Sequence, residues 1–337
     1  MKTSYIRFIL IVVLTFFLWP SSALRAEAVR RAYRGIIVVT SDSVVRAMEP
    51  YGGSLADGRN YADIVNIYHE EFPDVEIYCM VIPTAAGLYC PDTAKVWSRD
   101  EREVIQALHN NLQTDVHIVD ILPILEQHSE ENIYLRTDHH WAPLGAYYAA
   151  QEFARVAGVP FSDITHYDQH VVHNFVGTMA RFSRDISVRN SPEDFIYYIP
   201  RDAVYETIST PYFLNKSRSA VLRTGETREV EFFRQYNDGS SAAYCTFMGG
   251  DTNTTQVHTS TNNGRRLMIL KDSYGNALPG YLFSSFEEIF VVDCRYFTEN
   301  IRKFVTGHQI TDILFANNLI HASSKKTTLS YENYLVQ

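Results

Sequence analysis

The first part of the chain contains two patterns of apolar residues: short continuous runs, and residues that recur at helical spacing. Short runs rich in Ile and Val occupy residues 34–42, 74–85 and 116–125, which is typical of buried strands. Between them, residues 58–72 and 98–112 repeat apolar side chains at helical spacing. The order strand, helix, strand, helix, strand predicts an α/β fold, with a parallel sheet flanked by helices on both faces.

A third helix is expected after residue 142. Pro143 suits the first turn of a helix, apolar residues such as Ala146 and Phe153 then recur on one face, and Gly158 is a suitable end. Residues 138–141, in which two histidines stand between an aspartate and a tryptophan, therefore lead directly into this helix.

The amino-acid composition and the apolar pattern change between residues 161 and 265. Tyr, Thr, Ser and Arg are frequent, and short alternating stretches are separated by turn signals, which predicts a β-rich insertion over the sheet. The α/β pattern resumes in residues 265–286, 286–297 and 311–320. Each of these segments contains an apolar run suited to a central strand.

The N-terminal residues 1–28 have the layout of a secretory signal peptide. Lys2 and Arg7 flank an apolar run at residues 8–19, and small residues follow. The run is short for a membrane span, so we expect cleavage and a secreted or cell-envelope protein, with an uncleaved N-terminal anchor as the alternative. Residues 29–337 would then form one domain that includes the β-rich insertion.

The net charge limits the class of partner, and the cysteine content limits the role of disulfides. The formal net charge is −9, and it becomes −11 without the signal peptide, which holds three basic residues and one acidic residue. An acidic exported protein suits a glycan better than nucleic acid or an anionic membrane, and we expect no cofactor. The four cysteines are too few for a disulfide scaffold. Export allows a Cys79–Cys90 bridge, and free buried cysteines fit equally well.

Residues 267–280 contain a candidate nucleophile. Residues 267–270 are continuously apolar, as in a strand buried on both faces, and the chain then turns through residues 272–276 into another expected helix. Reactive groups gather beyond the carboxyl ends of strands in open parallel sheets. Ser273 would lie there, beside backbone N–H groups able to stabilise an oxyanion. An Asp-Ser pair is equally an ordinary helix N-cap.

The histidine-rich segment supplies a candidate base and acid. If residues 137–141 are extended, side chains two positions apart project to the same side. Asp138 can then fix the tautomer of His140, whose other ring nitrogen is free to take the proton of a serine. In this arrangement His139 points the other way, and Trp141 is an aromatic wall or a packing residue.

Metal binding is the alternative for the histidines. Two clusters hold competent ligands: Asp138, His139 and His140, and His166, His170 and His173. The second cluster would share a face only in a helix, whereas its segment alternates like a strand. Neither cluster is accompanied by a Cys pair or an H-E-x-x-H pattern, and we therefore expect no metal site.

Further residues are candidates for substrate binding or oxyanion stabilisation: Trp141, Tyr274, Asn276, Arg295 and Asn317. Arg295 follows a strand and could reach the reactive edge of the sheet, or it could pair with Asp293 or stack on a neighbouring aromatic ring. Asn317 closes a strand where an oxyanion donor could sit, and a turn role is also compatible with that position.

The stretches "TDHHW", "GAYYAAQEF", "LKDSYGNALPGYL" and "VVDCRYF" resemble the DHHW family of exported bacterial proteins over most of the mature chain. That family is similar to the alginate O-acetylation proteins AlgJ and AlgX, whose domains are SGNH-hydrolase-like. The resemblance implies an SGNH-hydrolase-like fold and a catalytic triad of Asp138, His140 and Ser273. Two features depart from the wider superfamily: the acid and base precede the serine, and Lys271 stands where a glycine is common.

The resemblance also implies a function. We expect an O-acetyltransferase or acetylesterase that acts on a cell-surface or extracellular polysaccharide, with a membrane-bound acyl-donor protein as a further partner. Transfer and hydrolysis share an acyl-enzyme and differ in what attacks it. The contrasting hypothesis is a non-catalytic envelope protein that binds a glycan or a partner protein on the same fold.

Overall fold

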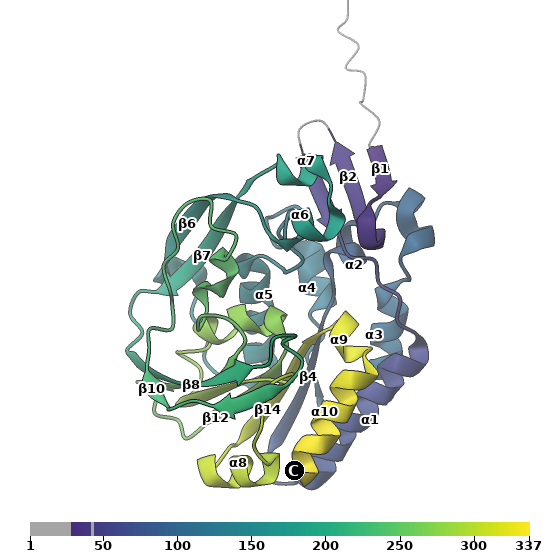
Figure 1. Ribbon diagram of the computed structural model, residues 1–337. Coiled ribbons are helices and arrows are strands. Elements are labelled where there is room, and N and C mark those ends of the chain that lie inside the picture. The colour runs from purple at the N-terminus through teal and green to yellow at the C-terminus, as the bar shows by residue number, and fades with distance from the viewer. Residues whose placement is uncertain (1–27, 42–43) are drawn as a thin grey trace, which may run out of the picture.

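A large mixed β-sheet forms the centre of the computed structural model, which describes residues 28–41 and 44–337 (Figure 1). Its nine strands run in the order β10-β8-β11-β13-β12-β14-β4-β5, and β9 also pairs with β8. The strands are β4 (Glu76–Ile82), β5 (His117–Ile118), β8 (Tyr205–Leu214), β9 (Val221–Thr224), β10 (Arg228–Glu229), β11 (Asn253–Thr259), β12 (Arg266–Lys271), β13 (Glu288–Asp293) and β14 (Asp312–Asn318). All but the last residue of the predicted signal peptide lies outside the described residues.

The sheet is parallel in one part and antiparallel in the other. Strands β13, β12, β14, β4 and β5 pair in parallel, as the sequence pattern predicts. Strands β11, β8, β9 and β10 come from the segment 161–265 and pair antiparallel beyond β13. The predicted parallel sheet is therefore confirmed in part, and the prediction that the β-rich segment lies over the sheet is wrong for these strands, which continue the sheet through the pairing of β11 with β13. The fold is mixed α/β.

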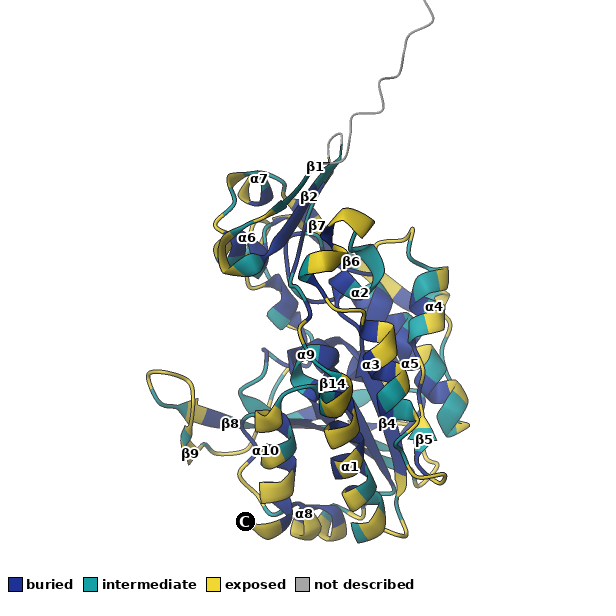
Figure 2. Cartoon of the chain, turned by 90° about the vertical axis from the view of Figure 1, so that its right-hand side faces the viewer, coloured by how far each residue is buried: buried dark blue, intermediate teal, exposed yellow. Residues whose placement is uncertain are grey.

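Helices cover both faces of this sheet. One core cluster packs α1 (Leu55–Glu71), α3 (Glu101–His109), α8 (Ile301–His308), α9 (Leu319–Ala322) and α10 (Lys325–Val336) on one face. The other packs α2 (Ala85–Tyr89), α4 (Leu122–Gln127) and α5 (Pro143–Ala157) on the opposite face. Figure 2 shows the buried strands behind α1 and α10, whose outer sides are exposed. The predicted bounds of α5 are confirmed, with Pro143 in its first turn and Gly158 left-handed at its end.

The first predicted strand belongs to a second, smaller sheet. Strand β2 (Ile37–Ser41) pairs antiparallel with β1 (Ala28–Arg31) and β3 (Val44–Met48), so its assignment to the main sheet is wrong. This sheet packs against α6 (Thr178–Ser183) and α7 (Ile186–Arg189) in a separate core cluster, at the top of Figure 1. Strands β6 (Tyr167–Phe175) and β7 (Glu193–Pro200) form a separate two-stranded antiparallel sheet.

Local structure departs from the prediction in two further places. The run at residues 116–125 forms only the short strand β5, and α4 follows it. The helix expected after Asp272 is a pair of 3-10 turns, Ser273–Ala277 and Pro279–Tyr281. Pro279 has no N–H to donate, which explains why a regular helix does not continue from the first turn.

All four cysteines are free, so no Cys79–Cys90 bridge is present. Within residues 28–41 and 44–337, no helix has the length and apolar character needed to cross a bilayer.

Candidate active site

Ser273 begins a turn at the carboxyl end of the parallel strands, directly after β12 and Asp272. The carboxylate of Asp272 holds this turn in place. Its Oδ1 accepts a hydrogen bond from the backbone N–H of Tyr274 at 2.9 Å, and its Oδ2 accepts one from the N–H of Asn318 at 2.7 Å. Because Asn318 ends β14, these bonds join the ends of two neighbouring strands. The serine is thus fixed at the edge of the sheet where reactive groups are expected.

The structure brings Ser273, His140 and Asp138 into one hydrogen-bonded chain. His140 Nδ1 lies 2.6 Å from Asp138 Oδ1, and His140 Nε2 lies 2.8 Å from Ser273 Oγ. A carboxylate only accepts hydrogen bonds, so His140 carries its proton on Nδ1. The lone pair on Nε2 then accepts the hydrogen bond of the serine hydroxyl. This is the arrangement in which an imidazole can take the proton of a nucleophile.

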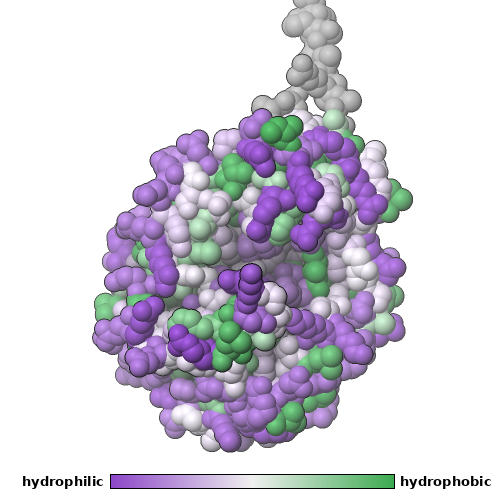
Figure 3. All heavy atoms as spheres, viewed as in Figure 1, coloured by the Kyte–Doolittle hydropathy of each residue, from purple (hydrophilic) through white to green (hydrophobic). Residues whose placement is uncertain are grey.

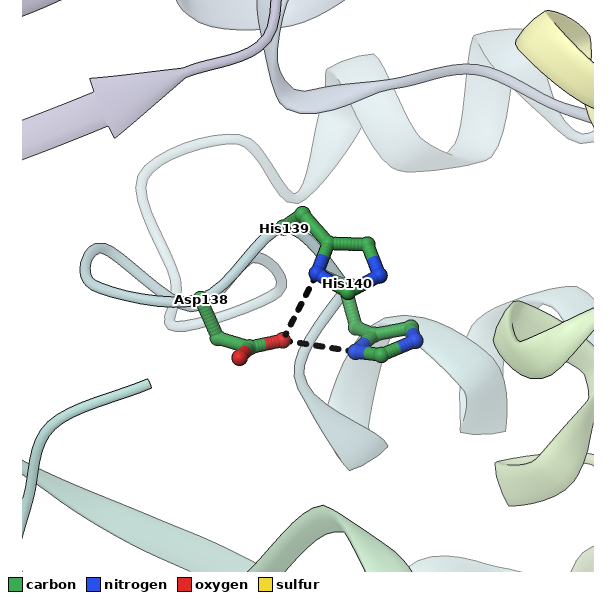
Figure 4. A group of neighbouring side chains, drawn as sticks. All are labelled: Asp138, His139 and His140. Carbon is green, nitrogen blue, oxygen red and sulfur yellow. Dashed lines mark hydrogen bonds and ion pairs between the residues drawn. The ribbon is translucent and has the colours of Figure 1, made fainter. Parts of the chain in front are cut away.

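Asp138 and His140 meet through a tight turn and not through an extended strand. The backbone N–H of His140 donates to Asp138 Oδ1 at 3.1 Å, which closes an Asx turn over residues 138–140. The sequence pattern predicts that His139 points away from Asp138 and His140. This prediction is wrong, because the turn places His139 beside them. Its ring lies 3.8 Å from the ring of His140, and its Nδ1 is 3.7 Å from Asp138 Oδ1 (Figure 4).

The second oxygen of Asp138 is held by the start of α6. Thr178 donates to Asp138 Oδ2 twice, from its backbone N–H at 2.7 Å and from its hydroxyl at 2.9 Å. Burial by itself would raise the pKa of Asp138, but the neighbouring His140 and His139 and the hydrogen bonds bring the pKa well below its usual value. The carboxylate is therefore ionised at neutral pH and can stabilise a protonated His140.

Both faces of the His140 ring are covered. The Tyr244 ring stacks on it at 3.8 Å with an interplanar angle of 5°, and His139 covers the other face. Burial first, and then the neighbouring His140, lower the pKa of His139 to about 4, so this second histidine is neutral at neutral pH. Only the edge of His140 that carries Nε2 is left for chemistry. Tyr244 and Thr178 have no motif that marks them in the sequence.

The site opens to a restricted extent. Ser273 is 9 % exposed and His140 is 7 % exposed. Figure 3 shows a hollow near the middle of this face, between the regions labelled α6 and β8 in Figure 1. The side chains of Ser273 and His140 are thus largely covered, and little of their surface is open to a substrate.

Trp141 and Tyr274 pack beneath the site. Trp141 is fully buried, and its indole N–H donates to the backbone carbonyl of Tyr274 at 2.8 Å. Tyr274 is 3 % exposed, and its hydroxyl donates to the carbonyl of His139. These contacts tie the serine turn to the histidine turn, so both aromatic residues position the reactive groups.

Asn317 also holds the serine turn from within the protein. Its side-chain N–H donates to Asp272 Oδ2 at 3.3 Å, and its oxygen accepts from the hydroxyls of Tyr61 and Tyr331, both at 2.6 Å. The residue is fully buried. Its amide is thus used by Asp272 and is not available to an oxyanion in this arrangement.

A buried network of opposite charges lies behind Ser273. Lys271, which is 1 % exposed, binds Asp293 at 2.9 Å, and Arg295 binds both Asp293 at 2.6 Å and Asp251 at 3.0 Å. Asp251 in turn accepts from Asn276 Nδ2 at 2.7 Å. Arg295 therefore pairs with Asp293, one of the roles that its position allows, and the side chain of Asn276 is held by Asp251. Asp251 is a residue that the sequence pattern does not indicate.

Asp138, His139 and His140 are also the group that could hold a metal ion in the described part of the chain, since their ligand atoms lie within 4.8 Å of one another. Their hydrogen bonds already use these atoms, however. Asp138 Oδ1 and His140 Nδ1 bind each other, and His139 Nδ1 lies 2.6 Å from the hydroxyl of Thr178. An ion could bind only by replacing these contacts. The donor set therefore suits proton transfer better than metal binding.

Comparison with known proteins shows the family of the chain. The model of the family described as DHHW protein matches residues 24–292. The chain belongs to the DHHW family. A crystal structure of a DHHW family protein from Eubacterium siraeum is 35 % identical, has a TM-score of 0.81, and covers 92 % of this chain and 99 % of its own. A search of curated proteins finds no match.

Two other solved structures are less similar to this DHHW protein. PatB1 from Bacillus cereus is 17 % identical with a TM-score of 0.66, over 87 % of this chain and 99 % of PatB1. At this identity the likeness concerns the fold alone. The O-acetyltransferase domain of AlgJ from Pseudomonas putida is 13 % identical with a TM-score of 0.42, over 91 % and 99 % of the two chains. That score is too low to carry an argument about this protein.

Proposed function

We propose that this DHHW protein has an SGNH-hydrolase-like fold and is a serine-dependent O-acetyltransferase or acetylesterase acting on a cell-surface or extracellular polysaccharide. The observation that supports this function is the hydrogen-bonded chain from Ser273 Oγ through His140 to Asp138. Such a chain supplies a nucleophile, a base and an orienting carboxylate in one place. No cofactor is needed for this chemistry.

In the first step Ser273 Oγ attacks the acyl carbonyl and its proton passes to His140 Nε2. His140 then gives that proton to the leaving group as the bond between the acyl carbon and the leaving group breaks, which leaves acetyl-serine and a neutral His140. The negative charge of Asp138 stabilises the imidazolium, and backbone N–H donors at the serine turn stabilise the oxyanion. The N–H groups of Tyr274 and Gly275 already donate to Asp272, at 2.9 and 3.0 Å. We therefore assign the backbone N–H of Ser273 itself to the oxyanion.

In the second step a hydroxyl group attacks the acetyl-serine. His140 takes the proton of that hydroxyl and returns a proton to Ser273 Oγ as the acyl–oxygen bond breaks. A sugar hydroxyl gives transfer, and water gives hydrolysis. The acidic composition and the predicted export signal at residues 1–28 favour a glycan outside the cytoplasm, with a membrane-bound acyl-donor protein as the source of acetyl groups.

The first experiment measures an acyl-enzyme. Wild-type protein should release the leaving group of an acetyl-ester reporter and gain one acetyl group at Ser273 by mass spectrometry. A sulfonyl fluoride should also label Ser273. Ser273→Ala should abolish the release of the leaving group, the acetylation and the sulfonyl labelling. His140→Gln should reduce the rate of each by several orders of magnitude, because the base is lost. Ser284→Ala is the matched control, since Ser284 bonds to Ser162 away from the site.

The contrasting function makes the opposite prediction. A non-catalytic glycan-binding or partner-binding protein would show no acyl-enzyme with any acetyl donor, including an acetylated oligosaccharide. It would still bind the oligosaccharide, and Ser273→Ala would bind it equally well. That combination of results would replace the enzymatic proposal with the binding one.

A further inference from the structure

His139 has a tautomer that its neighbours determine. Its Nδ1 lies 2.6 Å from the hydroxyl oxygen of Thr178. The single proton of that hydroxyl is donated to Asp138 Oδ2, because a carboxylate only accepts. The Thr178 oxygen must then accept the hydrogen bond of His139 Nδ1–H. With its proton on Nδ1, the neutral ring of His139 carries a lone pair on Nε2.

That lone pair faces the region where His140 acts. Figure 4 shows the two imidazoles one above the other, with both Nε2 atoms on the side away from Asp138. The ring centroids are 3.8 Å apart, and the side chain of His139 is 22 % exposed. Within residues 28–41 and 44–337 we find no protein donor to His139 Nε2. The site thus presents two neighbouring acceptors, of which His140 Nε2 serves Ser273.

We propose that His139 is a specificity-determining residue, whose Nε2 accepts a hydrogen bond from a second hydroxyl of the acyl acceptor. The site would then select acceptors with two adjacent hydroxyl groups, as in the vicinal diol of a sugar ring. This inference rests on the proposed function, and it concerns the acceptor of the acyl group.

The chemistry follows from the spacing of the two rings. One hydroxyl of the diol gives its proton to His140 Nε2 as its oxygen bonds to the acetyl carbon, and that proton then passes to Ser273 Oγ as the acyl–Oγ bond breaks. The neighbouring hydroxyl donates to His139 Nε2 and keeps its proton throughout. The ring centroids are 3.8 Å apart, so two hydroxyls on adjacent ring carbons can each reach one of the two imidazoles and both bonds can form together.

The test compares two acceptors within the same acyl-enzyme. With p-nitrophenyl acetate as donor, the amount of acetyl transferred per acceptor hydroxyl of trans-1,2-cyclohexanediol is divided by the acetate released, and the measurement is repeated with its mono-O-methyl ether, which has a single hydroxyl. Because each ratio is internal, an overall loss of activity cancels. In the wild type the ratio for the diol should exceed that for the ether by roughly three- to tenfold, as expected for one hydrogen bond.

Variants then assign this preference to His139. His139→Phe keeps an aromatic ring against His140 and removes the acceptor, so the preference should fall to about one. His139→Gln can still accept through its amide oxygen and should retain part of it. His166→Phe is the control, because His166 is an exposed histidine away from the reactive groups. Equal ratios for the two acceptors in the wild type, or an unchanged preference in His139→Phe, would overturn the inference alone. A wild type that forms no acetyl-serine would overturn the proposed function and this inference with it.

Discussion

Asp138→Asn tests whether Asp138 sets the tautomer of His140. The carboxylate serves two partners: Oδ2 accepts twice from Thr178, and Oδ1 accepts from both the Nδ1–H and the backbone N–H of His140. An amide has only one oxygen and must place its NH₂ group against one of these partners. The backbone bond from Thr178 is 2.7 Å long and that from His140 is 3.1 Å, so the oxygen should stay with Thr178.

The expected size of the effect follows from this orientation. The NH₂ group would then face His140 Nδ1 and force the ring proton onto Nε2, which can no longer accept the proton of Ser273. A wrong tautomer of this kind costs about 10⁴-fold in kcat, equivalent to about 5.4 kcal/mol. The backbone N–H of His140 also loses its acceptor, which should lower the free energy of unfolding by about 1–3 kcal/mol.

The assay measures kcat for acetyl-ester hydrolysis, the rate of sulfonyl fluoride labelling at Ser273, and the thermal midpoint. Both rates should fall together, and the variant should remain folded. Asp163→Asn makes the same change at an exposed N-cap and should leave the rates unchanged. A folded Asp138→Asn variant with kcat within about tenfold of the wild type would refute the tautomer argument, since that argument requires a loss of about 10⁴-fold.

Two further changes test the packing of the site and a buried carboxyl. Gly177→Ala should lower kcat by at least about tenfold, because the added Cβ would collide with Asp138. The control is Gly307→Ala, where the added Cβ meets nothing within 4 Å and the free energy of unfolding should rise by about 0.5–1 kcal/mol. Equal kcat in both variants would exclude the steric explanation. Burial raises the pKa of Glu101 to about 7 despite hydrogen bonds from Thr84, so stability should fall as pH rises from about 4.3 to about 7, where only the unfolded carboxyl ionises. Glu101→Gln should remove that fall in urea denaturation midpoints, and parallel pH curves for the two proteins would contradict the assignment.

Apolar patterning predicted burial more reliably than strand partners. Within the run at residues 267–270, Leu267 and Ile269 enter one core cluster while Met268 and Leu270 enter the other, so this strand is buried on both faces, as its sequence indicates. The run at residues 34–42 has the same character, and its residues 36–39 are also buried on both faces, yet this strand pairs within the small sheet. A continuous apolar run indicates that both faces of a strand are buried. It does not indicate which strands pair with it, because that depends on contacts distant in sequence.

The same limit applies to the site. The type and spacing of Asp138 and His140 and the place of Ser273 after a buried strand were visible in the sequence, because each depends on a few neighbouring residues. Thr178 and Tyr244 were not, because they reach the histidines from 38 or more positions away and a threonine or a tyrosine alone indicates no role.

The error at His139 has a physical cause that also bears on function. Alternation of side chains holds for an extended strand, but Asp138 Oδ1 accepts the backbone N–H of His140 and thereby bends the chain between them. The bend allows adjacent histidines to stack, which a strand would prevent. The oxygen that orients His140 through its ring is therefore the same oxygen that places His139 beside it. If both histidines act on the acceptor, the base and the selectivity of the site depend on one carboxylate, and neither can be altered at Asp138 without the other.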